Sequence, residues 1–548
     1  MDNQRLIFFV ILSFSILLLW DSWQKEQYPT KPDQQSSAPA AQSVSPTPLP
    51  SPGLDGGSVT VAESQAETIQ SGTKINVRTD VYRAEIDTMG GDIRSLEMVK
   101  HHDAEDKTKP FILYEDKGQR MYIAQSGLIG SGLPNHKSSY NAQAASYQIG
   151  ENEKQVQVKL VWAGENGLSV EKSYIFHKGS YLIEIAHEII NNTPAPITPH
   201  AYYQWLRDDK APAGDPAFVS TYTGPAVYTD KEKFQKVDFS DIEKGKEKYP
   251  KQSNDGWIAI LQHYFFSAWL PAENEAREFY TKKVGKFFAA GVIVPVGTVE
   301  PGAKKNTKMS LYAGPQEQDT ISKLAPGLDL VVDYGMLTVI AAPLFWIIQL
   351  IYKVVQNWGV AIILLTILIK LGFYPLSAKS YRSMAAMRVV SPKLQKLKEQ
   401  YGNDRQRLHQ AMMELYKTEK INPLGGCLPV IVQMPVFIAL YWVLLYSVEM
   451  RQAPFVAWIQ DLSAPDPYFV LPIIMGITMI VQTKLNPTPP DPIQAKVMAM
   501  MPIVFSIFFF FFPAGLVLYW VVNNVLSIAQ QWQITRSFEL AKSAKGHG

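Results

Sequence analysis

The pattern of hydrophobic and polar positions divides the chain into a β-rich part and a helical part. Between about residues 58 and 325, apolar residues alternate with polar ones in short runs, for example at Val156, Val158 and Leu160. Such alternation is typical of half-buried strands. Turn signals separate the runs, among them Gly90-Gly91, Asn166-Gly167 and Lys178-Gly179-Ser180. We therefore predict that residues 58–330 form one large antiparallel β-sandwich.

Long apolar stretches follow residue 335 and predict membrane helices. They lie near residues 336–355, 360–376, 427–448, 468–481 and 497–532. The last stretch is too long for one crossing and is interrupted at Pro513-Ala514-Gly515, which predicts two helices joined by a tight turn. The first contains Pro343, Gln349 and Lys353. We interpret it as an amphipathic helix that lies in the membrane interface, within a segment at 331–358.

The N-terminus carries a separate, shorter apolar run at residues 6–20, directly after Arg5. A retained signal-anchor helix over residues 1–22 and a cleaved signal peptide both fit this pattern. We favour the anchor, because the nearest Ala-x-Ala sequence lies well beyond the apolar run. Residues 23–57 are rich in Pro, Ser, Gln and Ala and predict a disordered linker.

The distribution of charge predicts the topology. Residues 379–420 carry ten Lys and Arg against four Asp and Glu, which places this loop in the cytoplasm. Both termini then lie in the cytoplasm, in agreement with the basic tail at 536–548, whereas a five-span alternative would export that tail. The large β-domain would lie in the periplasm. Six spans are expected near residues 5–22, 359–377, 427–448, 467–483, 497–512 and 515–532.

The composition and short motifs of the chain give no indication of a catalytic or ligand-binding site. The formal net charge of +2 argues neither for nor against nucleic acid, and no direct nucleic-acid partner is predicted. Cys427 is the single cysteine, so an intramolecular disulfide is excluded. The histidines show no metal-ligand spacing, and the chain has no phosphate-loop or nucleophile-elbow motif. We therefore predict no cofactor, no metal and no catalytic residue.

Lys370 lies inside an apolar segment, where an ammonium group costs at least about 2.5–3.5 kcal/mol. At about 1.5 Å per helical residue, Lys370 and Gln433 are both expected about 9 Å inside the cytoplasmic face. Asn523 and Asn524 lie near the middle of the last span, and Ser527 lies one turn closer to the cytoplasm. Apolar residues fill the outer halves at 440–445 and 508–512. This arrangement predicts a wet recess open to the cytoplasm; the alternative is that Lys370 snorkels to the inner headgroups.

The cytoplasmic loop predicts two helices, at 380–400 and 404–420, divided by Gly402-Asn403, with Pro392 expected to kink or restart the first. One interpretation is a mobile helical hairpin that receives an apolar client on adaptable methionines. The alternative is a plain solvated hairpin. The methionines concerned are Met384, Met387, Met412 and Met413.

The run Asn422-Pro-Leu-Gly-Gly-Cys-Leu-Pro-Val-Ile-Val-Gln-Met-Pro435 closely resembles the YidC/Oxa/Alb family of membrane-protein insertases. The resemblance extends over almost everything after residue 335. It includes Asn357-Trp-Gly359, Tyr374-Pro375, Arg451-Gln-Ala-Pro-Phe455, Trp458-Ile-Gln-Asp-Leu462 and Phe512-Pro-Ala-Gly-Leu-Val-Leu-Tyr519. The anchor and the large β-domain look like the Gram-negative form of the family.

The resemblance implies a polytopic α-helical membrane protein with a five-helix insertase core at 359–535, built around a hydrophilic groove. The β-domain would be a β-supersandwich similar to sugar-mutarotase folds. The implied partners are nascent membrane proteins, the Sec translocon with its accessory subunits, the ribosome and the lipid bilayer. The implied location is the bacterial inner membrane.

Carried over residue by residue, Lys370 matches the family's groove arginine. Tyr519 and Trp520 fall where the family typically has two tyrosines, so Trp520 is a departure that replaces a hydroxyl with an indole donor. The remaining residues that match groove positions, or that the depth argument places beside them, are Thr366, Gln433, Trp458, Asn523 and Asn524.

Two other functional classes stay open at this point. A transporter or channel would need polar residues through the outer half of the membrane part as well. A membrane-anchored carbohydrate-active enzyme would need a histidine and an acidic residue facing one cleft of the β-domain.

Overall fold

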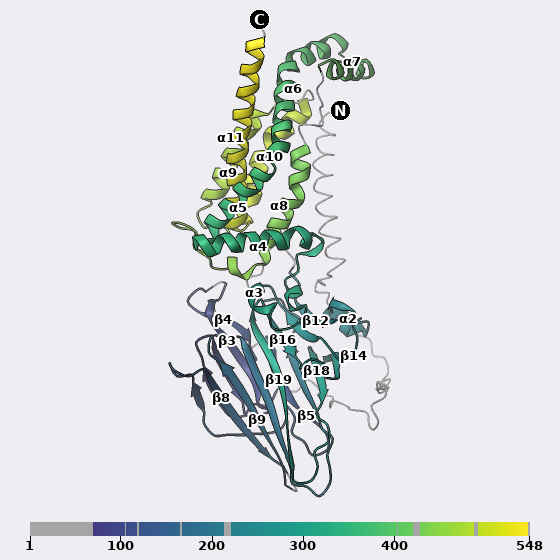
Figure 1. Ribbon diagram of the computed structural model, residues 1–548, viewed down its shortest axis with the longest axis vertical. Helices are drawn as coiled ribbons and strands as arrows, with labels where there is room; N and C mark the ends of the chain where they lie inside the picture. Colours follow the sequence, from purple (N-terminus) through teal and green to yellow (C-terminus); the bar gives the residue numbers. More distant parts are fainter. Residues whose placement is uncertain are drawn as a thin grey trace, which may run out of the picture. The chain divides into compact units, whose positions relative to one another are not determined.

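The computed structural model (Figure 1) describes residues 69–545 apart from 105, 118–119, 165–166, 213–220, 403, 420–427 and 487–491. The predicted anchor at 1–22 and the linker at 23–57 lie outside these residues, as does Cys427. The described chain divides into two compact units between Val331 and Val332. Each unit is treated by itself below.

The first unit is built from two large sheets. The ten-stranded sheet runs in the order β14 (Gln252–Ser253), β17 (Arg277–Val284), β18 (Phe287–Pro295), β11 (His200–Arg207), β5 (Tyr122–Ile129), β3 (Asp92–His102), β2 (Tyr82–Asp87), β1 (Lys74–Arg78) and β7 (Ser146–Gln148), with β4 (Pro110–Tyr114) paired to β3. The nine-stranded sheet runs in the order β13 (Lys233–Lys236), β12 (Gly224–Thr229), β15 (Trp257–Leu261), β16 (Phe265–Leu270), β19 (Ala303–Pro315), β10 (Leu182–Asn191), β9 (Leu168–His177), β8 (Gln155–Ala163) and β6 (Asn141–Ala142). Short helices α2 (Phe239–Lys244), α3 (Gln318–Ile321) and η2 (Leu328–Val331) complete it.

The predicted turns join neighbouring strands. Gly90 and Gly91 connect β2 to β3 and both have positive φ, at 77° and 60°. A side chain at Gly90 would also meet the carbonyl oxygen of His136 at 2.5 Å, so glycine is required there. Gly179, with φ 70°, connects β9 to β10. The β-sandwich is therefore confirmed, although β1 and β7 pair in parallel rather than antiparallel as predicted.

A group of charged side chains lies in the interior of this unit. Lys172 on β9 is fully buried, and its ammonium reaches the other sheet, where it donates to the carbonyl oxygens of Gly90 and Ser126 at 2.9 and 3.0 Å. Burial lowers the pKa of Lys172 to about 8, against the attraction of Asp92. Burial raises the pKa of Asp92 to about 6, against the opposing effects of Lys172 and Arg94. Lys172 and Asp92 stabilise each other's charged form, because an unpaired charge in the interior is costly.

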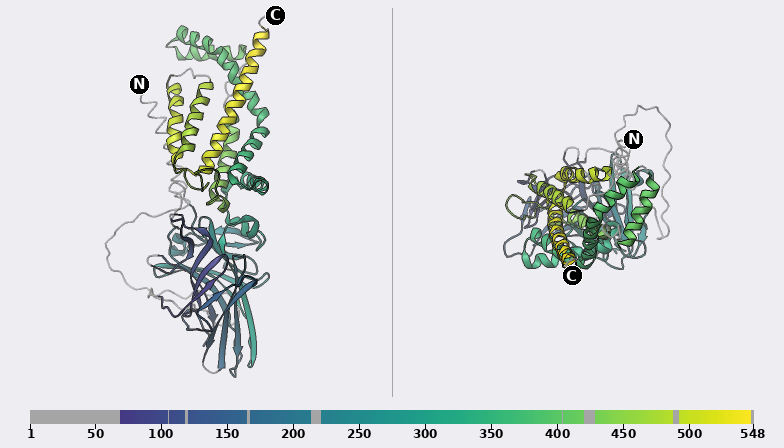
Figure 2. Two further views of the ribbon diagram at one scale, coloured as in Figure 1. Left: turned by 90° about the vertical axis from the view of Figure 1, so that its left-hand side faces the viewer. Right: turned by 90° about the horizontal axis from the view of Figure 1, so that it is seen from above.

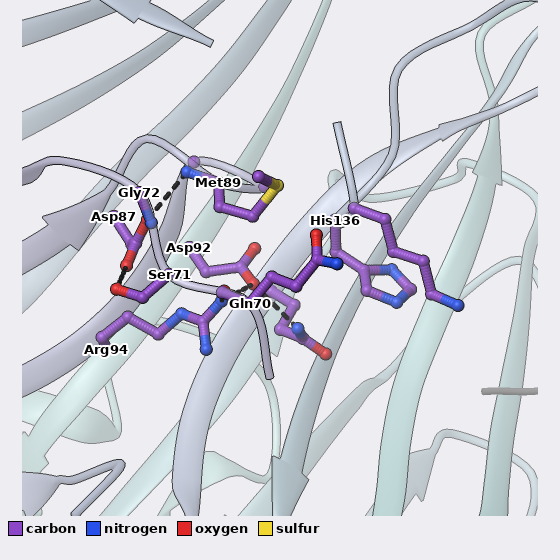
Figure 3. A network of polar contacts seen from close by, with 12 residues as sticks. Gln70, Ser71, Gly72, Asp87, Met89, Asp92, Arg94 and His136 are labelled. Atoms are coloured by element: carbon purple, nitrogen blue, oxygen red, sulfur yellow. Dashed lines mark hydrogen bonds and ion pairs between the residues drawn. The ribbon is translucent and has the colours of Figure 1, made fainter. Parts of the chain in front are cut away.

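Figure 3 shows how Asp92 is held from the side of its own sheet. One carboxylate oxygen of Asp92 accepts from the amide of Gln125 at 2.8 Å and lies 3.6 Å from the guanidinium of Arg94. Arg94 also donates to the carbonyl oxygen of Gln70 at 3.2 Å. The nearby buried Asp87 accepts from the hydroxyl of Ser71 and from backbone N–H groups. The strands therefore enclose a network of buried acids and bases, in which the second carboxylate oxygen of Asp92 and the Nε of Arg94 have no hydrogen-bond partner among the described residues.

The second unit is helical (Figures 1 and 2). Helices α5, α8, α9, α10 and α11 lie side by side as a bundle, and α6 and α7 form a hairpin at one of its ends. The bounds are η3 (Gly335–Leu337), α4 (Thr338–Val355), α5 (Trp358–Gly372), α6 (Tyr374–Tyr401), α7 (Arg405–Thr418), α8 (Leu428–Tyr446), η5 (Val448–Met450), α9 (Val470–Leu485), α10 (Pro492–Phe508), η6 (Phe509–Phe511) and α11 (Ala514–Lys545).

Helix α4 runs across the bundle helices instead of along them (Figure 1). One side packs on α5 and α8 through buried residues such as Leu344 and Ile348. The opposite side is also apolar, and Val339 and Val354 are more than four-fifths exposed there. The helix is thus less amphipathic than predicted, and its outer side has the composition of a lipid-facing surface.

Length and hydropathy alone leave the number of crossings open. In the part of the chain that the structure describes, one helix, Gly335–Val355, is long and apolar enough to cross a membrane. The pair α5 and α6 would be a second if its 68° bend were part of one span. The apolar segments Val432–Tyr446, Val470–Leu485 and Ala495–Phe511 are shorter.

One detail of the predicted helices is wrong. A single span was predicted at 359–377, but α5 ends at Gly372 and the chain bends at Phe373 before α6. The predicted depth of Lys370 below the cytoplasmic face was calculated for a straight helix beyond this residue, and it therefore does not hold. Helix α6 continues through Pro392, so it does not restart there, and its ribbon bends before it meets α7 (Figures 1 and 2). By contrast, the hairpin turn near Gly402 and the break before Ala514 lie where the sequence predicts them.

The start of α5 is fixed by a polar cap and by close packing. The side chain of Asn357 accepts from the backbone N–H of Val360 at 3.0 Å and donates to the carbonyl oxygen of Phe455 at 2.9 Å. Gly359 lies against the ring of Phe455 so closely that a Cβ there would collide with it. This packing explains why the Asn-Trp-Gly sequence suits the first turn of α5.

Candidate functional site

The helical unit contains a cavity of about 310 Å³ lined by α5, α6, α8, α9 and α11. Most of the side chains around it are polar. The polar set is Lys370, Ser377, Ser380, Tyr381, Gln433, Gln482, Thr483, Asn486, Tyr519, Asn523, Asn524 and Ser527. The rest of the lining consists of Met384, Met434, Phe437, Met479 and Trp520. We call this cavity the groove.

Lys370 is the one charged side chain among the residues that line the groove. It is 5% exposed, and its ammonium donates to the hydroxyl oxygen of Ser527 at 2.7 Å. The Ser527 hydroxyl in turn donates to the carbonyl oxygen of Asn523 at 2.7 Å. The ammonium is therefore held inside the bundle. This geometry favours the recess over the snorkelling alternative.

Amide side chains tie the groove helices together. Gln433 on α8 donates to the side-chain oxygen of Asn523 on α11 at 2.6 Å. Asn524 donates to the hydroxyl of Thr478 on α9 at 3.2 Å. Gln531 lies about two helical turns after Asn524 on α11. It donates to the side-chain oxygen of Asn486 at 3.0 Å. These bonds fix the polar wall, because buried amides without partners are costly.

An aromatic layer borders the polar lining. The ring of Phe437 lies 4.4 Å from that of Trp520 and 6.0 Å from that of Tyr519. Phe509 lies 5.4 Å from Trp520 and is buried. Other members of the phenylalanine run, Phe508 and Phe511, are exposed. The predicted apolar closure therefore rests on part of that run only, together with buried residues of α8 such as Leu440 and Leu444.

Six of the eight predicted groove residues line the cavity together: Lys370, Gln433, Tyr519, Trp520, Asn523 and Asn524. Thr366 and Trp458 are not among its lining residues. Thr366 is buried, and its hydroxyl donates to the carbonyl oxygen of Ile362 in its own helix at 2.7 Å. Trp458 lies in the loop before α9 and donates to the carboxylate of Asp466 at 3.0 Å. That carboxylate also accepts the backbone N–H of Leu471 at the start of α9.

The four hairpin methionines have three different environments. Met384 lines the groove. Met387 and Met412 pack between α6 and α7, around the buried residues Val390, Leu394 and Tyr416. Met413 is 41% exposed. Two of the four are therefore part of the hairpin's own core.

The prediction missed several lining residues on α6 and α9. On α6, Ser377, Ser380 and Tyr381 recur at helical spacing. On α9, Met479, Gln482 and Thr483 do the same. A polar stripe with this period is the signal that would have found them, because such residues share one helix face.

One cavity of the β-unit, of about 430 Å³, is lined by Asp230, Asp255 and Glu273 but by no histidine, so this cavity lacks the pair of residues that a sugar enzyme would need. Within the described ranges, no group of three His, Cys, Asp or Glu residues could hold a metal ion.

Comparison with known proteins identifies the family. Residues 74–347 match the model of the YidC periplasmic domain, and residues 350–542 match that of the 60Kd inner membrane protein. The membrane protein insertase YidC of Methylobacillus flagellatus is 58% identical over 551 residues, covering 100% of this chain and 99% of its own length. That of Nitrosospira multiformis is 54% identical over 557 residues, covering 98% of each chain. A solved structure of an active YidC insertase is 16% identical with a TM-score of 0.40, covering 85% of this chain and 94% of its own.

Both family models are matched in order, and the identity to relatives extends over the full length. The chain therefore belongs to the YidC family of membrane protein insertases, inner-membrane proteins with a periplasmic domain whose clients are membrane proteins and which are not enzymes.

Proposed function

We propose that the groove is where this insertase receives the polar segment of a client that must cross the membrane. The observation that carries the proposal is the buried ammonium of Lys370 in a polar cavity whose lining holds no acidic side chain. A polar segment in hydrocarbon has no hydrogen-bond partners, and burying it there costs several kcal/mol. Amides and hydroxyls of the groove would replace part of the water shell of the client's polar segment.

The charge adds a preference for acidic segments. A carboxylate about 4 Å from an ammonium gains roughly 4 kcal/mol at the effective dielectric constant of a protein surface. The membrane potential would assist the same segments by about 2.3 kcal/mol per charge per 100 mV. The client's apolar segment would meanwhile partition into lipid beside the groove, driven by hydrophobic transfer.

The proposed topology has six spans, with both termini in the cytoplasm. Positive charge in the α6–α7 hairpin supports a cytoplasmic position for it. Figures 1 and 2 show the hairpin at the same end of the helical unit as the end of α11, as this topology requires. The transverse α4 would lie in the outer interface. The first span is the anchor at 1–22, outside the described residues.

The hairpin would make the first contact with clients through its exposed surface. Met413 and the groove-lining Met384 remain available for this role, whereas Met387 and Met412 hold α6 against α7. Cooperation with the Sec translocon and with ribosomes is proposed from the family resemblance alone.

Reconstitution separates this function from that of a channel. We expect the full-length chain, alone in liposomes, to insert a single-span client with a short acidic tail, so that the tail becomes protected from added protease. The same liposomes should show no more efflux of a trapped small solute than protein-free liposomes, because the aromatic layer borders the groove. Solute efflux without client protection would contradict the proposal and favour a channel.

A further inference from the structure

The geometry points to Ser527 as a positioning residue that holds the Lys370 ammonium in the groove. This inference rests on the proposed role of Lys370 and deepens it. Lys370 lies on α5 and Ser527 on α11, and their side chains are 5% and 3% exposed. The distance of 2.7 Å between the ammonium nitrogen and the hydroxyl oxygen is that of a charge-assisted hydrogen bond.

Lysine needs such a partner more than arginine does. Its ammonium is a point charge on a flexible four-carbon stem, whereas arginine carries five donors on a rigid planar group. A long, flexible side chain near a helix end turns readily toward water. Lys370 lies two residues before the end of α5, so the position by itself does not keep its charge inside the bundle.

The hydroxyl of Ser527 is oriented to accept a hydrogen bond from the Lys370 ammonium. A serine hydroxyl has one hydrogen to donate and two lone pairs that accept. The hydrogen of Ser527 goes to the carbonyl oxygen of Asn523, one turn earlier in α11. The lone pairs therefore remain for Lys370 and for the Tyr381 hydroxyl, which also hydrogen-bonds to Ser527. The Ser527 hydroxyl does not compete with the ammonium as a donor toward the client.

This acceptor is itself anchored by a third helix. Asn523, which receives the Ser527 hydrogen on its backbone oxygen, receives the amide of Gln433 from α8 on its side chain. A chain of hydrogen bonds thus runs from α8 through α11 to the ammonium on α5. Each bond in such a chain restrains the next, which favours one position of the charge.

The test compares Ser527→Ala, which removes the acceptor, with Ser527→Thr, which keeps it. Two clients are used that differ only in the tail, which is acidic in one and neutral in the other. We expect Ser527→Ala to reduce insertion of the acidic-tailed client by about tenfold, the loss of one hydrogen bond to a charged group. The neutral client should be little affected, and Ser527→Thr should retain the preference for the acidic tail.

Ser537→Ala is the matched control. Ser537 lies on the same helix and donates to the carbonyl oxygen of Gln533 in the same way, but it is exposed. It should leave both clients unaffected. A Ser527→Ala variant that lowers insertion of both clients equally, or that leaves the acidic preference unchanged, would overturn the positioning role.

The Lys370→Met background separates this inference from the proposed function. If Ser527 acts through Lys370, adding Ser527→Ala to Lys370→Met should change nothing further. If Lys370→Met itself leaves the acidic preference intact, the proposed function fails. If Lys370→Met abolishes the preference and Ser527→Ala does not reduce it, the positioning role alone fails.

Discussion

Replacing Lys370 with methionine should reduce insertion of an acidic-tailed client by about tenfold to a hundredfold, because the groove loses the one charge in its lining. Methionine keeps much of the length and apolar volume of the lysine stem, so the packing of α5 should change little. Lys370→Arg should retain most of the insertion, since the argument requires a positive charge and not an ammonium as such. The measurement is the protease-protected fraction of client in liposomes that contain the full-length variant.

Lys484→Met provides the control for loss of a positive charge. Lys484 lies near the end of α9, is exposed and is not among the groove-lining residues. Its replacement should leave insertion close to that of the unaltered protein. Equal insertion of the acidic-tailed client by Lys370→Met and by the unaltered chain would remove the charge from the mechanism.

The second large effect concerns the β-unit. Lys172→Met should lower its free energy of unfolding by about 3–5 kcal/mol, because Asp92 then has only Arg94 to compensate its buried charge. The carbonyl oxygens of Gly90 and Ser126 lose their donor at the same time. Hydrogen exchange at the backbone amides of β9 and β10 in the full-length protein measures the change.

The loss in Lys172→Met should depend on pH. Burial already raises the pKa of Asp92 to about 6, and Lys172 opposes that rise, so its removal raises the pKa further. A carboxyl group whose pKa is higher in the folded state binds its proton more tightly there, so stability falls as pH rises from about 4 through that pKa. The variant should therefore be less stable at pH 8 than at pH 5, and its deficit should be greater at pH 8.

Lys159→Met is the control on the neighbouring strand β8. Lys159 forms a surface ion pair with Glu171 at 2.8 Å. Exposed pairs of this kind contribute at most about 1 kcal/mol. Comparable destabilisation by Lys159→Met and Lys172→Met, or a Lys172→Met deficit that is the same at both pH values, would refute the account of the buried network.

The sequence predicted which unit is built from strands and which from helices, because the alternation of the strands and the long apolar stretches of the helices are both regular patterns. Alternation marked the strands, and glycines at tight turns marked their ends. The burial of Lys172 was not predicted, although Lys172 lies on the same face of β9 as Val170 and Tyr174, which are both buried. The alternation placed it on the core face, but a lone lysine on a strand is more often read as exposed.

The groove was predictable where polarity sufficed. Lys370, Gln433 and Asn523 line one cavity, as expected of polar groups in otherwise apolar helices, although the bend after α5 invalidates the depth assumed for Lys370. Thr366 shows the limit of that argument, since a hydroxyl can be satisfied within its own helix and so need not line a cavity. Trp458 lies in an irregular loop, whose path no periodic pattern encodes.

The hairpin and the bend show what requires tertiary structure. Met387 and Met412 were indistinguishable from Met413 until the register of α6 against α7 was known. The bend at Phe373 was predictable in part, because Gly372 ends α5 and Pro375 lies in the first turn of α6, and glycine and proline favour such a change of direction. Its angle of 68° depends on the packing of neighbouring helices, which requires the tertiary structure.

The central claim is that the client's polar segment passes through the groove and not along the lipid-facing surface. Photo-crosslinkers placed at Gln433 and Gln482, which line the groove, test this most directly when compared with positions Ile503 and Val525, which are exposed on α10 and α11. With a client arrested during insertion, its polar segment should crosslink from Gln433 and Gln482 and not from Ile503 or Val525. Crosslinks of the polar segment from the lipid-facing positions alone would contradict the claim.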